Sequence, residues 1–357
     1  MIQPARVSSS RKILQLVSAA VSLTIGGMRV VQLARAAERR LGLVDSGMLR
    51  LLRDHPSVYS LATAALDSGI HIRELVERSI ATERLDYDAV YHGQSEWHIL
   101  PAADHPDEPA RCLVSGTGLT HVKSAETRQA MHAAGQELTD SARMYRWGAE
   151  GGRPAPDAIG VAPEWFYKGP GSILRGHLDP LSVPSYAEDG GEEPEIAGIY
   201  VIAKSGEPVR IGMAAGNEFS DHRLEKKNYL YLAASKLRTC AIGPELVLDP
   251  DFTRVSGTVS IERGGSVLWS RAVHSGEEAM CHSLANLEHH HFKFESHRRP
   301  GDIHVHFFGA DAFSFGEGVR LVDGDVMVIS FNGFGRPLRN PLRVERGPAT
   351  LVVAKPW

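Results

Sequence analysis

Short apolar segments separated by turn residues dominate the hydrophobic and polar pattern of this chain. Beyond residue 165 they span 198–203, 209–213, 246–248, 255–261, 267–269, 303–308, 326–331 and 342–344. Segments this short predict β-strands, and Glu262-Arg-Gly-Gly265 between two of them predicts a hairpin turn. In this half of the chain, helices are expected at 226–238 and 277–294. Many strands with few helices favour a β-rich α+β fold, rolled or barrel-like, over repeated βαβ units.

The first hundred residues predict a smaller unit. Residues 28–51 alternate apolar stretches with charged turns, as the strands of a hairpin do. Residues 59–66 and 72–80 carry apolar side chains at the three- and four-residue spacing of helices. A turn-rich stretch follows at 102–109. We therefore expect a small N-terminal α/β domain over 28–100, a linker over 101–112 and a catalytic β-roll domain over 113–357.

Residues 1–27 need a separate interpretation. Arg6, Arg11 and Lys12 precede an apolar run over 13–25, which superficially resembles a signal peptide. The run contains several polar residues, is too short to span a bilayer, and lacks a clean Ala-x-Ala cleavage site. We expect a disordered or mis-assigned extension, with Met1 or Met28 as the true start, and no membrane partner.

Composition narrows the classes of function. The 357 residues are 43% hydrophobic and 23% charged, as in ordinary globular proteins. The formal net charge is -4 and no basic run is coupled to aromatic residues, so nucleic acid is not an expected partner. Three widely spaced cysteines without a Cys-x-x-Cys motif indicate a reducing compartment, and the cytoplasm is the expected location.

The leading chemical hypothesis rests on three glutamates. Glu193 and Glu195 are two residues apart on a strand-like segment, so their carboxylates are expected on the same face. Crowded carboxylates resist ionising together, and a hard divalent cation relieves that conflict. Oxygen ligands suit Mg²⁺ or Mn²⁺ better than zinc. Glu218 follows the next apolar segment and is a candidate third ligand, although strand-face glutamates are more often simply solvated.

Other polar residues are candidates for proton transfer or substrate binding. His121 follows a Gly-rich strand end, and Glu126 downstream is near enough in sequence to orient its ring. Lys168 lies in an aromatic and apolar setting, where it could pair with a carboxylate. Lys236 lies on a predicted helix. The alternatives are a helix-start histidine and ordinary surface lysines.

Other chemistries lack their motifs. Glu288-His-His-His291 with His304 and His306 suggests zinc, but adjacent histidines on a helix face different directions and no His-Glu-x-x-His occurs. No Gly-x-Ser-x-Gly motif supports a serine hydrolase. Neither a dinucleotide-binding nor a phosphate-cradling glycine motif is present, which disfavours nucleotide chemistry.

The motifs, in their order, resemble those of the fumarylacetoacetate hydrolase superfamily, and within it the branch of bacterial arabinose and other sugar-acid catabolism. They are Gly116-Thr-Gly-Leu-Thr-His121, Phe166-Tyr-Lys-Gly-Pro-Gly-Ser172, Glu193-Pro-Glu195, Asn217-Glu218, Lys236, Ile242-Gly-Pro244 and Gly324-Asp-Val326. The resemblance covers 113–345, and residues 28–100 are similar to the family's small N-terminal domain.

This resemblance implies a rolled, incomplete β-barrel of mixed strands in a homodimer. It also implies a divalent cation, Mg²⁺ or Mn²⁺, held by three carboxylates, and a 2-oxo acid chelated to it. The residues implied are the metal ligands Glu193, Glu195 and Glu218, the active-site lysines Lys168 and Lys236, and a proton-transfer pair, His121 and Glu126, on a mobile lid helix. Whether Lys236 or the His121–Glu126 pair supplies the base stays open.

Two departures from the family pattern bear on the reaction. Glu218 stands where aspartate is common, and Phe308-Gly-Ala-Asp-Ala-Phe313 replaces a Thr-Gly-Thr-Pro turn that helps carbon–carbon bond hydrolases bind substrate and water. The leading hypothesis is therefore Mg-dependent dehydration of a 2-keto-3-deoxy sugar acid in sugar catabolism, such as arabinose degradation. A pentonate giving 2-oxoglutarate semialdehyde is the expected substrate. The alternatives are an acylpyruvate-type hydrolase, a 2-oxo acid decarboxylase and a non-catalytic sugar-acid-binding protein.

Overall fold

The computed structural model of the chain describes residues 27–132 and 139–357. The expected extension, residues 1–27, lies outside these residues except for Gly27. The fold is mixed α+β and rich in strands, as the apolar pattern predicted. No helix in the described ranges is long and apolar enough to cross a bilayer.

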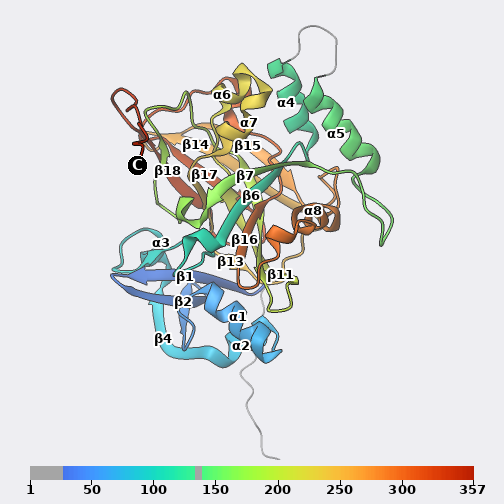
Figure 1. Cartoon of the computed structure of the whole chain (residues 1–357). Helices are drawn as coiled ribbons and strands as arrows, with labels where there is room; N and C mark the ends of the chain where they lie inside the picture. Colours follow the sequence, from blue (N-terminus) through green and yellow to red (C-terminus); the bar gives the residue numbers. More distant parts are fainter. Residues whose placement is uncertain (1–26, 133–138) are drawn as a thin grey trace, which may run out of the picture.

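The N-terminal strands and helices form one end of the molecule (Figure 1). The strands are β1 (Arg29–Arg35), β2 (Glu38–Asp45), β3 (Met48–Leu52), β4 (Ile80–Asp86) and β5 (His98–Ile99). The helices are α1 (Val58–Ser68), α2 (Ile72–Ser79) and α3 (Tyr87–Tyr91). Helix α1 begins at a capping box, because Ser57 and Ser60 each bond the other's backbone N–H.

The N-terminal strands belong to the same sheet as the central strands of the molecule. The next strand after β1 is β13 (Leu246–Val247), with Arg29 opposite Val247. The sheet then continues through β11 (Pro208–Asn217), β10 (Pro194–Ile202), β16 (Ile303–Phe307), β6 (Cys112–Gly118) and β7 (Glu164–Pro170). Two short strands, β8 (Leu174–Arg175) and β12 (Cys240–Ile242), pair beside it. The division into domains at 101–112 stays a prediction.

The large sheet is mixed and does not close into a barrel. Strand β16 runs antiparallel to β10 but parallel to β6, with His306 opposite Ser115. Strands β4 and β7 stand at opposite ends of the strand order. The coarse expectation of a rolled, incomplete β structure therefore agrees with the observed topology.

A second sheet packs against the first. It contains, in order, β15 (Ser266–Ser275), β14 (Val255–Arg263), β17 (Val326–Phe331), β18 (Leu338–Val344) and β9 (Leu181–Val183). One apolar cluster joins Ile329 and Val259 of this sheet to Ile196 and Met213 of the other. The predicted hairpin turn is confirmed, since β14 and β15 pair across Gly264 and Gly265, which have φ of 58° and 82°.

The remaining helices lie around the rim of the sheets (Figure 1). They are α4 (Val122–His132), α5 (Asp140–Gly151), α6 (His222–Lys227), α7 (Leu232–Lys236) and α8 (Leu284–Phe292). Helices α4 and α5 pack together as a pair.

Two helix predictions need correction. A single helix over 226–238 is wrong, because Asn228 is extended and its side chain accepts the Leu230 N–H, which starts a separate turn. The helix expected from residue 277 begins only at Leu284, where Ser283 is the N-cap and accepts the Asn286 N–H. Local capping by short polar side chains outweighs the apolar spacing in both places.

Candidate metal centre

Three buried carboxylates meet where β10 begins and β11 ends. Antiparallel pairing places Pro194 opposite Asn217, so Glu193 and Glu195 of one segment come next to Glu218 of the other. One carboxylate oxygen from each glutamate lies within 4.8 Å of the others, and all three residues are buried. The alternative of solvated surface glutamates therefore does not hold.

The backbone turn directly after β11 places the side chain of Glu218 in the cluster. Phe219 is buried and has a φ of 33°, a left-handed conformation that bulky residues rarely adopt. Asn217 supports the turn, because its Oδ1 accepts the N–H groups of Glu193 and Phe219, each at 3.3 Å. Strain held by surrounding contacts is typical of functional sites.

Two buried lysines hold the carboxylates together. The Lys236 Nζ donates to Glu193 Oε1 at 2.6 Å and also to Glu218. The Lys168 Nζ donates to the other oxygen of Glu218 and to the carbonyl oxygens of Phe219 and Lys236, at 3.0 and 2.9 Å. The structure thus joins both predicted lysines to Glu193 and Glu218 and contradicts the alternative of surface lysines.

The pKa values of the three glutamates are shifted in different directions. Burial raises the pKa of Glu195 well above its usual range, and the charges of Glu218 and Glu193 raise it further. Burial likewise raises the pKa of Glu218. Burial also acts upward on the pKa of Glu193, but Lys236 and His222 outweigh it and hold that pKa well below its usual range. Nearby positive charge thus favours ionised Glu193, whereas burial and the neighbouring carboxylates disfavour ionisation of Glu195.

The donor set fits a hard divalent cation. Three carboxylates within 4.8 Å offer oxygen atoms only, and Mg²⁺ and Mn²⁺ prefer such ligands. A cation at this place would relieve the repulsion that raises the pKa of Glu195.

Several supporting residues were not predicted from the sequence. His222 contacts Glu193 through Nε2 at 3.1 Å, and its ring stacks on Phe313 and Phe315 with centroids 4.8 and 5.1 Å away. Glu192, also buried, accepts bonds from the Ser314 N–H and hydroxyl at 2.6 and 2.9 Å. These contacts link residues up to 122 positions apart, so no local sequence pattern predicts them.

The loop after β16 is hydrogen-bonded directly to the metal centre. The Gly309 N–H donates to Glu195 Oε2 at 2.6 Å. Gly309 has a φ of 97°, and a Cβ there would lie 2.0 Å from the Thr120 hydroxyl. Only glycine fits such a position without displacing its neighbours. The Phe308–Phe313 segment, noted above as a departure from the family pattern, thus lies at the site.

His121 and Glu126 are placed differently from one another. His121 is buried at the start of α4, where its carbonyl oxygen accepts the Ala125 N–H, whereas Glu126 is exposed on that helix. The carboxylate that acts electrostatically on His121 is Asp311. The expected His121–Glu126 pair stays a prediction.

The histidine tract forms a neutral structural network. Trp165 donates to His291, whose Nε2 lies 2.9 Å from His304 Nδ1, and His306 contacts the hydroxyls of Ser115 and Thr117. Burial lowers the pKa of His304 and of His306 to about 3. Among the described residues, the glutamates alone bring three candidate metal ligands together.

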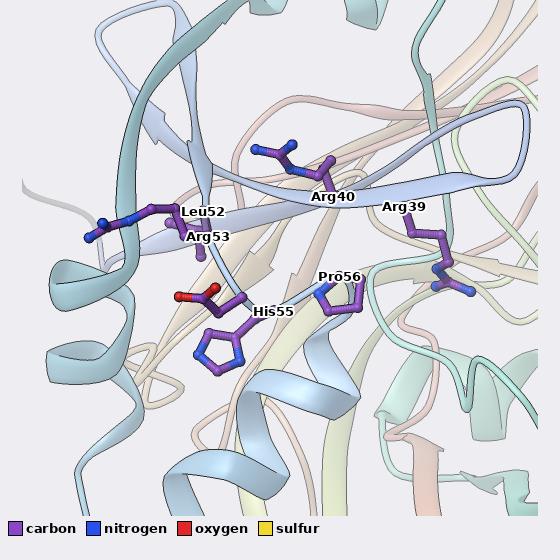
Figure 2. Close-up of a pocket in the computed structure, with 7 residues that line it drawn as sticks. Arg39, Arg40, Leu52, Arg53, His55 and Pro56 are labelled. Atoms are coloured by element: carbon purple, nitrogen blue, oxygen red, sulfur yellow. The ribbon is translucent and has the colours of Figure 1, made fainter.

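A separate hollow of about 390 Å³ lies on the N-terminal strands (Figure 2). It is lined by Arg39, Arg40, Leu52, Arg53, Asp54, His55 and Pro56. Carboxylates already pair two of its cations, since Arg39 bonds Asp104 at 2.6 Å and Arg40 bonds Glu83 at 2.7 Å. We therefore assign the chemistry to the glutamates.

Comparisons with known proteins bear on both fold and family. No family model matches the chain. Over 179 residues the chain is 29% identical to the "Probable 2-keto-3-deoxyxylonate dehydratase" of Haloferax volcanii. This match covers 48% of the present chain and 58% of that protein. The match thus spans little more than half of the length of this curated relative.

Solved structures match over nearly the whole chain. A 2-keto-3-deoxy-D-arabinonate dehydratase in apo form has a TM-score of 0.65 at 20% identity, covering 90% of this chain and 100% of that one. The same dehydratase complexed with magnesium and 2,5-dioxopentanoate gives 0.65 at 21% identity, with the same coverage. A 2-hydroxyhepta-2,4-diene-1,7-dioate isomerase from Mycobacterium marinum gives 0.55 at 15% identity, covering 89% and 99%. The solved structures show that the chain shares its fold with a 2-keto-3-deoxy-D-arabinonate dehydratase, and the partial match in Haloferax volcanii relates its sequence to another 2-keto-3-deoxy acid dehydratase. Both findings agree with the resemblance predicted from the sequence.

Proposed function

We propose that this protein is a metal-dependent hydro-lyase that dehydrates a 2-keto-3-deoxy sugar acid. The observation that carries the proposal is the buried cluster of Glu193, Glu195 and Glu218, which offers only oxygen ligands and is neutralised by lysines. The similarity to dehydratases of 2-keto-3-deoxy acids supports the same reaction class. A pentonate that yields 2-oxoglutarate semialdehyde is the proposed substrate.

The three glutamates would hold Mg²⁺ or Mn²⁺. A divalent cation bound there supplies a Lewis acid for the carboxylate and 2-oxo oxygens of the substrate, which makes the C3 proton more acidic. Lys168 and Lys236 orient the glutamates and balance their charge in the absence of that cation.

The reaction removes one water from the substrate. A base takes a proton from C3, the C–H electron pair forms the C3–C4 double bond, and the C4 hydroxyl leaves with a proton as water. This elimination leaves the C5 hydroxyl in place beside the C3–C4 double bond. Loss of a proton from C5 and gain of a proton at C3 move the double bond to C4 and C5. The enol formed in this way takes a proton at C4 and becomes the C5 aldehyde.

His121 and Lys236 are the proposed proton-transfer groups, and Glu126 is the partner that the sequence predicts for His121. A homodimer, a role in arabinose degradation and a cytoplasmic location stay predictions.

A substrate panel tests the proposal. The purified protein is incubated with 2-keto-3-deoxypentonates and with acylpyruvates, each with Mg²⁺ and with chelator, and the products are identified by mass spectrometry. We expect the semialdehyde from a pentonate, only when metal is present. Pyruvate and an acid from an acylpyruvate would instead support hydrolysis. Binding without any product would support a sugar-acid-binding protein.

A further inference from the structure

The hydrogen bonds around His121 fix which ring nitrogen carries the proton. The Thr120 hydroxyl lies 2.8 Å from the carbonyl oxygen of Phe308 and 2.9 Å from His121 Nδ1. A hydroxyl has one proton to donate, and a carbonyl oxygen can only accept it. The second contact must therefore be an Nδ1–H that donates to the Thr120 oxygen. His121 is thus the Nδ1–H tautomer when neutral, with a lone pair on Nε2.

The Nε2 lone pair of His121 is left without a protein partner. This atom is buried and has no hydrogen-bond partner among the residues that the structure describes. Burial lowers the pKa of His121 to about 4, so the ring is neutral near pH 7. A buried, unpaired acceptor is costly unless it has a function.

The same set of bonds leads from His121 to the metal centre. The peptide group between Phe308 and Gly309 accepts from Thr120 at its carbonyl oxygen and donates to Glu195 at its N–H. Each donor in the series points the same way, from His121 through Thr120 and this peptide to Glu195. Hydrogen bonds in such a series strengthen one another.

A carboxylate is available to stabilise a charge on His121. Asp311 is 7% exposed and lies two residues after Gly309. Its Oδ2 accepts the backbone N–H of His274 at 3.0 Å, with the His274 ring at 3.4 Å and Lys123 Nζ at 3.8 Å. The charge of Asp311 favours protonated His121, while that of His274 opposes it. The charged groups around Asp311 thus come from α4 and β15, and Asp311 itself lies in the loop after β16.

We propose that Thr120 and Asp311 are positioning residues that make His121 the base of the reaction. Thr120 holds the Nδ1–H tautomer, so that Nε2 takes the C3 proton, and Asp311 stabilises the imidazolium that results. This role deepens the proposed function and rests on it. It assigns to Asp311 the task that the sequence suggested for Glu126.

Nitrogen-15 NMR of the histidine side chains tests the tautomer without any substrate. We expect the Nδ1–H form of His121 in the wild type, and a shift toward Nε2–H in Thr120→Val, which keeps the shape of the side chain. Thr120→Ser should restore the wild-type spectrum. Thr63→Val is the matched control, because Thr63 also donates to a backbone carbonyl, at 2.9 Å, in helix α1. An Nε2–H form in the wild type, or an unchanged tautomer in Thr120→Val, would overturn the assignment.

The charge of Asp311 is tested by titration and kinetics. Asp311→Asn should move the NMR titration of His121 to lower pH and reduce kcat about 10- to 100-fold with little change in KM. Asp323→Asn is the control, since Asp323 also accepts a backbone N–H, that of Val344 in β18, at 2.9 Å. A titration that shifts in Glu126→Gln and not in Asp311→Asn would refute the role of Asp311. The NMR result stands even if the substrate panel shows no dehydration, so the two proposals fail separately.

Discussion

At the scale of single residues, the site depends on opposite charges held out of water. Glu218 receives bonds from two lysines, and Lys236 bonds two glutamates. Removing one member of a buried ion pair leaves an uncompensated charge, which costs more than the pair itself contributes. Substitutions here should therefore change metal binding and stability together.

Glu195→Ala should abolish metal binding and activity. It removes one of three ligands and leaves the Gly309 N–H without its acceptor. Isothermal titration with Mg²⁺ or Mn²⁺ measures the loss, and Glu207→Ala, a change at an exposed glutamate, is the control. Metal dependence equal to that of the wild type would contradict the assigned ligands.

Lys236→Met should make the protein dependent on metal for its stability. Without the ammonium group, Glu193 and Glu218 lose a buried partner, at a cost of about 3–5 kcal/mol. Added Mg²⁺ would replace that charge, so the rise in Tm on adding Mg²⁺ should exceed the rise in the wild type. Lys204→Met removes an exposed lysine paired with Asp67 and serves as the control. Equal responses of both variants to Mg²⁺ would argue against this role of Lys236.

At the scale of elements, the loop between β16 and β17 is part of the metal centre. It is attached at Gly309 to Glu195, at Ser314 to Glu192, and by the stacking of Phe313 on His222. Each contact joins the loop to the segment around β10 or to the start of α6. The orientation of Glu195, and that of Glu193 through His222, therefore depends on the conformation of this loop.

Gly309→Ala should damage the site more than an equivalent change elsewhere. Its φ of 97° disfavours a side chain, and the new Cβ would lie 2.0 Å from the Thr120 hydroxyl. Gly333→Ala is the matched control, with a φ of 87° and nothing within 4 Å of the added Cβ. We expect Gly333→Ala to cost about 1 kcal/mol and Gly309→Ala to cost more and to weaken metal binding. Urea unfolding compares them, and equal losses would contradict the clash.

At the scale of the whole molecule, buried neutral histidines make the fold sensitive to acid. Burial lowers the pKa of His177 and of His282 to about 4, and that of His304 and of His306 to about 3. The unfolded chain binds these protons near pH 6.5, so the stability they provide is complete above that pH and is lost as pH falls. For each pH unit below 6.5, each such histidine lowers the free energy of unfolding by about 1.4 kcal/mol, down to its pKa in the folded protein.

We therefore expect the urea midpoint to fall steadily between pH 6.5 and pH 4.5. The raised pKa values of Glu195 and Glu218 act in the opposite direction and reduce the slope. The variant His306→Gln should show a shallower dependence, because one buried site no longer takes up a proton on unfolding. His71→Gln, at a largely exposed histidine, is the control. A midpoint independent of pH would contradict this account.

The sequence predicted what depends on short-range patterns. Apolar spacing gave the strands and the hairpin at Gly264, and a spacing of two placed Glu193 and Glu195 together. These patterns could not predict His222 or Glu192 as neighbours of the site, because their contacts join distant parts of the chain. The broken helix at Asn228 shows the limit of periodicity when a polar side chain offers the backbone another partner.

The pairing of β1 with β13 has a consequence for any shortened form of this protein. Arg29 and Tyr87 both bond Glu245, a buried carboxylate next to β13, at 2.9 and 2.8 Å. A fragment that starts at residue 112 would lose both partners and expose the backbone of β13 as an unprotected edge strand, which invites association with other chains. We expect this fragment to aggregate on expression and to become monodisperse when residues 27–111 are supplied as a second polypeptide.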